Sequence, residues 1–174
     1  MKKLLSITLA ICILAICTPI TIAANYNGFV YEVNSDNTIT ITGYNDFNTS
    51  NVVIPSQIGG KNVTAIGQGA FQLKSNITNA KIPDTVKSVG TMAFYSCRNL
   101  KTVTLGSATT SIGAKAFNTC TSLTSINLRN VQTIGEYAFY GVKGVSTYTL
   151  PNSVTSIKGN AFSSGITIKC YSGS

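Results

Sequence analysis

The sequence predicts a solenoid, a fold in which copies of one short structural unit stack along a common axis. The dipeptide Ala-Phe occurs five times, at intervals of 23, 23, 22 and 23 residues, and its phenylalanines are Phe71, Phe94, Phe117, Phe139 and Phe162. A period in this range is typical of stacked repeats. Two further observations support the prediction. Other residues recur at fixed distances from each phenylalanine, and changes in repeat length are confined to one position.

Several apolar columns accompany the phenylalanines. A β-branched residue stands five positions before each one: Ile66, Val89, Ile112, Ile134 and Ile157. Glycine follows it in four copies, at Gly67, Gly90, Gly113 and Gly135. After each phenylalanine except the last comes an L-x-x-L-x-L-like segment: Ile77-Ala80-Ile82, Leu100-Val103-Leu105, Leu123-Ile126-Leu128 and Val145-Tyr148-Leu150. So many columns in one register predict that the same structural unit is repeated.

Each copy is predicted to contain two short strands, a corner and one helical turn. The L-x-x-L-x-L-like segment forms the first strand, and a V-x-x-I segment forms the second. Glycine marks the corner, and the helical turn runs through the residues that lead into Ala-Phe. The connection between the strands holds eight residues in the first copy, 55–62, and two in the fourth, Arg129 and Asn130. Because length varies only there, this connection is expected to be a surface loop.

The recurring phenylalanines are expected to form a continuous internal spine. One copy cannot bury its own apolar face, but stacked copies bury one another's. Parallel strands in register lie roughly 4.8 Å apart, so each column becomes a ladder along the stack. The role assigned to the five phenylalanines is therefore core packing.

Three cysteines follow the N-terminal segment: Cys97, Cys120 and Cys170. An odd number excludes a complete disulfide framework. Cys97 and Cys120 each stand three residues after a phenylalanine, so they are expected to be neighbours in adjacent copies. Their backbone separation would allow a bridge, but parallel side-chain directions fit one less well. Buried free thiols are predicted, with a Cys97–Cys120 disulfide as the alternative.

The assembled unit, L-x-x-V-x-L-P-x-x-V-x-x-I-G-x-x-A-F-x-x-C, resembles the BspA-like class of bacterial leucine-rich repeats. Residues 79–100 and 101–123 look like two nearly standard copies, and the resemblance covers about residues 49–170. It implies a right-handed leucine-rich-repeat solenoid, here with about five repeats of 22–23 residues. It also implies a secreted or surface-displayed protein of a class associated with adhesion to host matrix proteins, host cells or other microbes. It carries over no catalytic residues.

The chain departs from that class in two respects. Its five copies are few beside the longer arrays of many members, and the last copy lacks the full strand after Phe162. Residues 171–174 are expected to be the incomplete end of a closing segment. The sequence therefore leaves open whether the chain is a minimal or a truncated member.

Residues 1–24 are predicted to be a signal peptide. Two lysines supply the positive start, an apolar run extends from Leu4 to Ile20, and small residues offer a cleavage site after Ala23 or Ala24. An uncleaved membrane anchor is the alternative. After cleavage the protein is expected to be released, with no membrane contact.

Residues 25–48 are predicted to form a hairpin cap on the solenoid, which would occupy residues 49–170. Apolar and polar residues alternate over 29–33 and 38–41, on either side of a polar turn. A cap is expected there because an open solenoid end would expose strand edges and core.

Composition excludes several classes of activity. The chain has no histidine, so Ser-His-Asp and Cys-His arrangements and the usual zinc sites are impossible. The five carboxylates occupy unrelated positions of the repeat, and none forms a pair suited to glycoside hydrolysis. No catalytic residue, metal or cofactor is expected, and the protein is predicted not to be an enzyme.

Net charge points to weak, general attraction. The chain carries a formal charge of +8, and removing Lys2 and Lys3 leaves eleven basic against five acidic residues, a net of +6. Most basic residues are scattered singly, so attraction to anionic polymers such as glycans is expected. Nucleic-acid recognition would need a basic stripe with stacking aromatic residues, which the sequence lacks.

A binding function would have to use residues that point outward from the first strand of each copy. They form two candidate ladders: Asn51, Asn79, Thr102, Ser125 and Thr147, and Val53, Lys81, Thr104, Asn127 and Thr149. This face is either a solvated sheet surface or a recognition surface for an extracellular protein or glycan, weak and multivalent because it is small. One alternative is a self-assembling subunit that associates end to end. Another is an ice- or crystal-binding threonine array, which Lys81 and Val53 interrupt.

Overall fold

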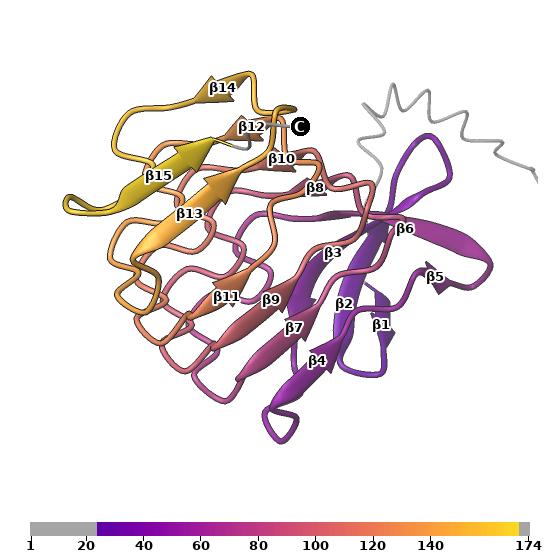
Figure 1. Cartoon of the computed structure of the whole chain (residues 1–174). Helices are drawn as coiled ribbons and strands as arrows, with labels where there is room; N and C mark the ends of the chain where they lie inside the picture. The colour runs from indigo at the N-terminus through magenta and orange to yellow at the C-terminus, as the bar shows by residue number, and fades with distance from the viewer. Residues whose placement is uncertain (1–23, 171–174) are drawn as a thin grey trace, which may run out of the picture.

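The computed structural model describes residues 24–170, and in that range the chain forms fifteen β-strands and no helix (Figure 1). The strands are β1 (Ala24–Tyr26), β2 (Phe29–Val33), β3 (Ile39–Tyr44), β4 (Asn51–Val53), β5 (Gln57–Ile58), β6 (Lys61–Ile66), β7 (Asn79–Lys81), β8 (Ser88–Val89), β9 (Thr102–Thr104), β10 (Ser111–Ile112), β11 (Ser125–Ile126), β12 (Thr133–Ile134), β13 (Thr147–Leu150), β14 (Ser156–Ile157) and β15 (Thr167–Cys170). The predicted signal peptide lies, except for Ala24, outside the described residues, as do residues 171–174.

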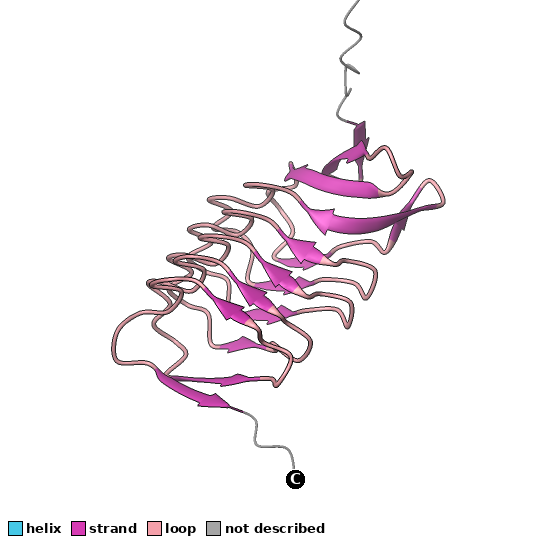
Figure 2. Ribbon diagram, turned by 90° about the horizontal axis from the view of Figure 1, so that it is seen from above, coloured by secondary structure: helices cyan, strands magenta, loops and turns pink. Residues whose placement is uncertain are grey.

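The strands stack as two parallel ladders, which confirms the predicted solenoid. One ladder has the order β3-β6-β8-β10-β12-β14, and the other has the order β11-β9-β7-β4. Equivalent residues of successive copies are in register, as where Ser111 pairs with Ser88 on one side and with Thr133 on the other. Figure 2 shows the turns of the chain displaced one after another along one axis.

The phenylalanines form the spine that their spacing predicts. Successive rings from Phe71 to Phe162 stack with centroids 4.8, 5.3, 5.4 and 5.4 Å apart and planes within 8° of parallel. The first four are fully buried, and Phe162 is half-buried. Because each ring contacts the next, the core is one continuous column along the stack.

The predicted helical turn through Ala-Phe is wrong. In the second copy, alternate N–H groups donate to carbonyl groups of the next copy at 2.8–2.9 Å; these donors are Met92, Phe94 and Ser96. The N–H groups between them donate within the copy, three residues back, at 3.0–3.2 Å: Ala93, Tyr95 and Cys97. Met92 and Ser96 have φ of 56° and 57°, which an α-helix does not allow. Bonds between copies replace the bonds along the chain that would make a helix.

The glycine at the corner permits close stacking. Gly113 follows β10, and a Cβ atom there would lie 2.6 Å from both the Gly90 carbonyl carbon and the Thr91 nitrogen of the preceding copy. Real Cβ atoms do not approach backbone that closely. The recurring glycine therefore allows the backbones of neighbouring copies to touch.

The expected number of five repeats is too small by one. β3 pairs in parallel with β6, and β4 pairs in parallel with β7, so residues 39–53 make a first turn of the solenoid. The Ala-Phe pattern does not reveal this turn because Tyr44 replaces the phenylalanine, with its ring 5.3 Å from that of Phe71.

The N-terminal cap is larger than the predicted hairpin. β2 pairs antiparallel with β3, as expected, and β1 adds a further antiparallel strand to β2. Phe29 on β2 lies over the end of the spine, 6.4 Å from Phe71. The eight-residue loop in the first copy forms its own small hairpin, in which β5 pairs with β6 and Ile58 is buried.

Cys97 and Cys120 are buried free thiols, and Cys170 is exposed. The Cys97 thiol donates to the Phe71 carbonyl oxygen at 2.9 Å, and the Cys120 thiol donates to that of Phe94 at 3.0 Å. Burial raises the pKa of Cys97 to about 12 and raises the pKa of Cys120 further. These thiols join adjacent copies by hydrogen bonds rather than by a disulfide.

Candidate binding site

The outer face of the β4-β7-β9-β11 sheet carries most of the predicted binding residues. Strand register aligns Asn51, Asn79, Thr102 and Ser125 in one ladder, and Val53, Lys81 and Thr104 in the other. Burial alternates along these strands, because the central residue of each points into the core. Val53 is the most exposed apolar residue of the face, at 62%.

The two ladders differ in how far their polar groups are satisfied. The Asn79 side chain donates to Asn51 Oδ1, and Thr102 Oγ1 donates to Asn79 Oδ1. The first ladder is thus a chain of side-chain hydrogen bonds that holds these groups in fixed positions. In the second ladder, Lys81 and Thr104 are exposed to solvent. This second ladder is the better placed to contact a ligand.

Asn127 does not extend the outer ladder as predicted. Its Oδ1 accepts a hydrogen bond from the Leu105 N–H at 2.8 Å, and its Nδ2 donates to the Leu105 carbonyl oxygen at 3.3 Å. The side-chain amide therefore makes the two hydrogen bonds to Leu105, directly after β9, that the backbone of a neighbouring strand would otherwise make. A polar residue at an outward position predicts exposure, so no pattern in the sequence indicates this role.

Thr147 and Thr149 are also not part of the continuous face. β13 does not pair with β11; it pairs in parallel with β15, and Thr147 and Thr149 are in register with Thr167 and Lys169. The sequence pattern at β13 matches the other copies apart from Tyr148, which stands where they have Val52, Ala80, Val103 and Ile126. The face predicted as five strands is therefore four strands and a separate pair.

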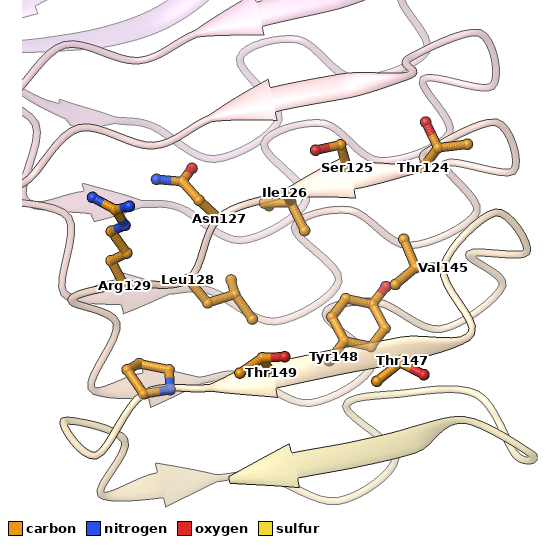
Figure 3. Close-up of a pocket in the computed structure, with 11 residues that line it drawn as sticks. Thr124, Ser125, Ile126, Asn127, Leu128, Arg129, Val145, Thr147, Tyr148 and Thr149 are labelled. Carbon is orange, nitrogen blue, oxygen red and sulfur yellow. The ribbon is translucent and has the colours of Figure 1, made fainter. Parts of the chain in front are cut away.

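A seam separates β11 from β13, and sequence analysis did not predict it. Between these strands lies a hollow of about 370 Å³, lined by residues of both strands and of the segments next to them, among them Ile126, Leu128, Val145 and Tyr148. Figure 3 shows these side chains between the two strands, with Arg129 at the end toward which both strands run. We call this hollow the seam.

Tyr148 explains why the strands separate here. Its ring packs against Phe139 and Phe162, with centroids 5.2 and 4.7 Å away. It is larger than the aliphatic residues at the same position of earlier copies, so it cannot be accommodated at the same strand spacing. Its hydroxyl is buried without a hydrogen-bond partner, and burial raises the pKa of this phenol far above its ordinary value.

Arg129, at the end of the seam, is exposed to solvent. In contrast to Arg98, whose Nε donates to Ser96 Oγ at 3.3 Å, Arg129 makes no hydrogen bond or ion pair within residues 24–170. Asp84 lines a neighbouring hollow together with Arg129 and accepts a 2.7 Å hydrogen bond from the Ser107 N–H, but it forms no ion pair with Arg129 within residues 24–170. Arg129 is consequently available to an anionic group.

The three aspartates of the described chain accept hydrogen bonds in turns and loops. Hydrogen bonds from Thr38, Thr49 and Ser107 lower the pKa of Asp36, Asp46 and Asp84, respectively. A general acid requires the opposite shift. Across residues 24–170, no three His, Cys, Asp or Glu side chains lie close enough to hold a metal ion. No helix in that range is long and apolar enough to cross a membrane.

The chain matches the family described as the BspA type leucine rich repeat region over residues 37–169, in six copies. The number of copies agrees with the turn that begins at β3. No match was found among curated proteins.

Solved bacterial structures share this fold. A leucine rich cell surface protein from Faecalibacterium prausnitzii A2-165 is 32% identical, with a TM-score of 0.76, over 86% of this chain and 42% of that one. A leucine rich repeat protein of T. pallidum is 30% identical, with a TM-score of 0.75, over 82% of this chain and 67% of that one. A leucine-rich repeat protein from Bacteroides ovatus is 28% identical, with a TM-score of 0.74, over 85% of this chain and 41% of that one. The chain thus spans less than half the length of two of these relatives. On the matched region, the repeat and the fold, it belongs to the BspA-type leucine-rich repeat family.

Proposed function

We propose that the protein acts outside the cell as a non-enzymatic binding module, in an adhesion-type interaction with a protein or a glycan. The observation that carries the proposal is the outer face of β4, β7, β9 and β11, where two in-register ladders present mostly polar side chains, together with Val53 and Lys81. The predicted signal peptide and the cell-surface description of a relative that is 32% identical support an extracellular site of action.

The size of the face limits its affinity. Four strands at roughly 4.8 Å spacing span about 15 Å. The area is well below the roughly 800 Å² that each partner buries in a standard interface. A single copy is therefore expected to bind weakly, and several copies displayed together are expected to bind well.

An array of glycans and matrix proteins, probed with residues 25–174 as a monomer and as a multimer, tests this function. Binding is expected for the multimer and near background for the monomer. Thr104→Glu and Lys81→Glu should abolish it. Thr133→Glu provides the matched control, because Thr133 is an exposed threonine on β12, in the other ladder of the solenoid. Binding that survives both changes on the face would refute the proposal, as would nanomolar binding by the monomer.

A second candidate function is self-assembly through the C-terminal turn of the solenoid. Ile157 is 43% exposed there, whereas Ile134, at the same position one copy earlier, is 1% exposed. Ile168 on β15 is 41% exposed. An apolar surface of this kind would be covered if a second copy stacked on it. Light scattering over a range of concentrations distinguishes the two functions, because a monomeric mass throughout excludes assembly.

A further inference from the structure

We propose that the seam between β11 and β13 binds an extended polypeptide as an added parallel strand, with its C-terminal carboxylate paired to Arg129. This site lies beside the face that carries the proposed function, but it does not depend on it. Four features of the seam support the proposal: its strand edges, its lining, one buried hydroxyl and its charge.

The strand edges that face the seam have no strand partner. In the preceding copy, the N–H groups of Thr124 and Ser125 both donate to the Lys101 carbonyl oxygen, at 2.9 and 3.2 Å. The equivalent bonds from β13 to the Thr124 carbonyl are absent within the described chain, whereas the equivalent bond on the opposite side of β13 is present: the Thr167 N–H donates to the Ser146 carbonyl oxygen at 2.9 Å. Successive residues of a parallel strand bond to opposite neighbours, so one set of backbone groups on each strand is left open to a new strand.

The lining fits a chain with alternating side chains. Ile126, Leu128 and Val145 provide apolar surface, and Ser125, Thr147 and Thr149 provide polar surface toward solvent. A strand inserted here would place every second side chain against the apolar residues and the others outward. The volume of about 370 Å³ falls within the range of ligand pockets. A sugar could use the hydroxyl groups but not the repeated backbone pattern.

Tyr148 supplies an unsatisfied polar group. The residue is 3% exposed, and its hydroxyl has no partner in the described chain although it lines the seam. Buried hydroxyl groups almost always have a hydrogen-bond partner. The hydroxyl is closed to solvent, so a strand that separates β11 from β13 further would be needed to bring a peptide group to it, and an unsatisfied group of this kind favours a ligand with backbone donors and acceptors.

Charge determines the direction of the ligand. β11 and β13 run the same way, and Arg129 and Pro151 line the end of the seam that follows both strands. A parallel ligand would therefore end beside Arg129. A guanidinium group binds carboxylates through two parallel hydrogen bonds, so a free C-terminus is the complementary group.

The test uses a peptide taken from the chain itself, N-acetyl-Leu-Lys-Thr-Val-Thr-Leu, which is the sequence of residues 100–105. This segment contains β9, which already pairs with β11 on its other edge. Calorimetry with residues 25–174 should show saturable binding of the peptide acid and about tenfold weaker binding of the C-terminal amide. The same peptide with proline in place of valine should not bind. No saturation by the acid at millimolar concentration overturns the proposal, and equal binding of acid and amide overturns the role of the carboxylate.

Two variants assign the contacts. Arg129→Gln should weaken binding of the acid about tenfold and leave the amide unchanged, so that the difference between them disappears. Arg98→Gln is the matched control and should preserve that difference. Tyr148→Phe should weaken both peptides about fivefold without lowering the thermal midpoint, because it removes a hydroxyl that has no partner in the free protein. A lower midpoint with unchanged binding would show that the hydroxyl serves the fold alone.

The two proposed surfaces can fail separately. Thr104→Glu should abolish binding on the array and leave peptide binding intact, whereas Arg129→Gln should affect only the peptide. Loss of both activities in either variant would contradict the separation of seam and face.

Discussion

At the scale of single residues, phenylalanines in different copies of the stack differ in their ring contacts and in their burial. Phe94 contacts a ring above and a ring below, whereas Phe162 contacts a phenylalanine on one side only and is half-buried. The buried thiols bond to the carbonyl groups of the phenylalanines one copy earlier. Position in the column, rather than residue type, determines how much each contributes to stability.

Replacing Phe94 by alanine should lower the free energy of unfolding by about 3–5 kcal/mol, because a buried ring is lost and a cavity remains. Phe162→Ala should cost less than half as much, since that ring is already partly exposed. Denaturant unfolding of both variants measures the difference. Equal losses, or a Phe94 variant within a degree of the original melting temperature, would contradict the spine.

The thiols give a prediction about pH. Burial raises the pKa of Cys97 to about 12 from an ordinary value of 9.0. Above pH 9 the unfolded chain loses thiol protons that the native state retains, so stability should decrease as pH rises from about 9 toward 12. The slope should be at most about 1.4 kcal/mol per pH unit for each buried thiol.

The number of reactive thiols should also change on unfolding. Native residues 25–174 should expose one reactive thiol, Cys170, and the unfolded protein should expose three. A Cys170→Ser control should react only when unfolded.

At the scale of the elements, backbone contacts between copies determine which residues are allowed. The turn around Phe117 has positive φ at two residues four positions apart, Lys115 and Thr119, at 57° and 56°. Neither residue type favours that region. The conformation persists because their N–H groups bond to the next copy, at 2.8 Å in both cases.

Gly113→Ala tests the close approach at the corner. The added methyl group would lie 2.6 Å from backbone of the preceding copy, so the variant should lose about 1–3 kcal/mol of stability. Gly159→Ala is the matched control, because nothing lies within 4 Å of a Cβ atom added at Gly159. Thermal unfolding of both compares them directly. If both variants melt alike, the glycine is not required for stacking.

At the scale of the whole molecule, the solenoid has different ends. At the N-terminal end, Phe29 and Tyr44 cover Phe71, and β1 and β2 add antiparallel strands beyond the first parallel strand. At the C-terminal end of the described residues, Ile157 and Ile168 are exposed. A stacked array requires a cover over its terminal copies to remain soluble.

Removing residues 25–48 should therefore cause association. Without them the edge of β6 and the face of Phe71 would be exposed, and exposed strand edges pair with other chains. Size-exclusion chromatography and light scattering of residues 49–174 should show oligomers or aggregates. A monomer with an unchanged melting temperature would show that residues 25–48, the cap together with β3 of the first turn, contribute nothing to the stack.

Much of the fold follows from periodicity. Each Ala-Phe, each apolar pair and each glycine corner occupies the predicted place, because a repeat identifies the same environment several times over. The first turn did not follow, since Tyr44 takes the place of phenylalanine and its spacing is irregular. The helical turn was wrong because the local pattern does not reveal that its N–H groups bond to another copy.

In the candidate site, the alignment of seven outward residues, from Asn51 to Ser125, follows from the repeat, since equivalent positions of stacked copies must be in register. Where that face ends depends on contacts between particular copies. Asn127 turns back to the Leu105 backbone, and β13, which carries Tyr148 in place of a smaller residue, does not pair with β11. The physical reason is that periodicity describes the average copy, whereas a ring too large for its neighbour's spacing changes the contact between two particular copies.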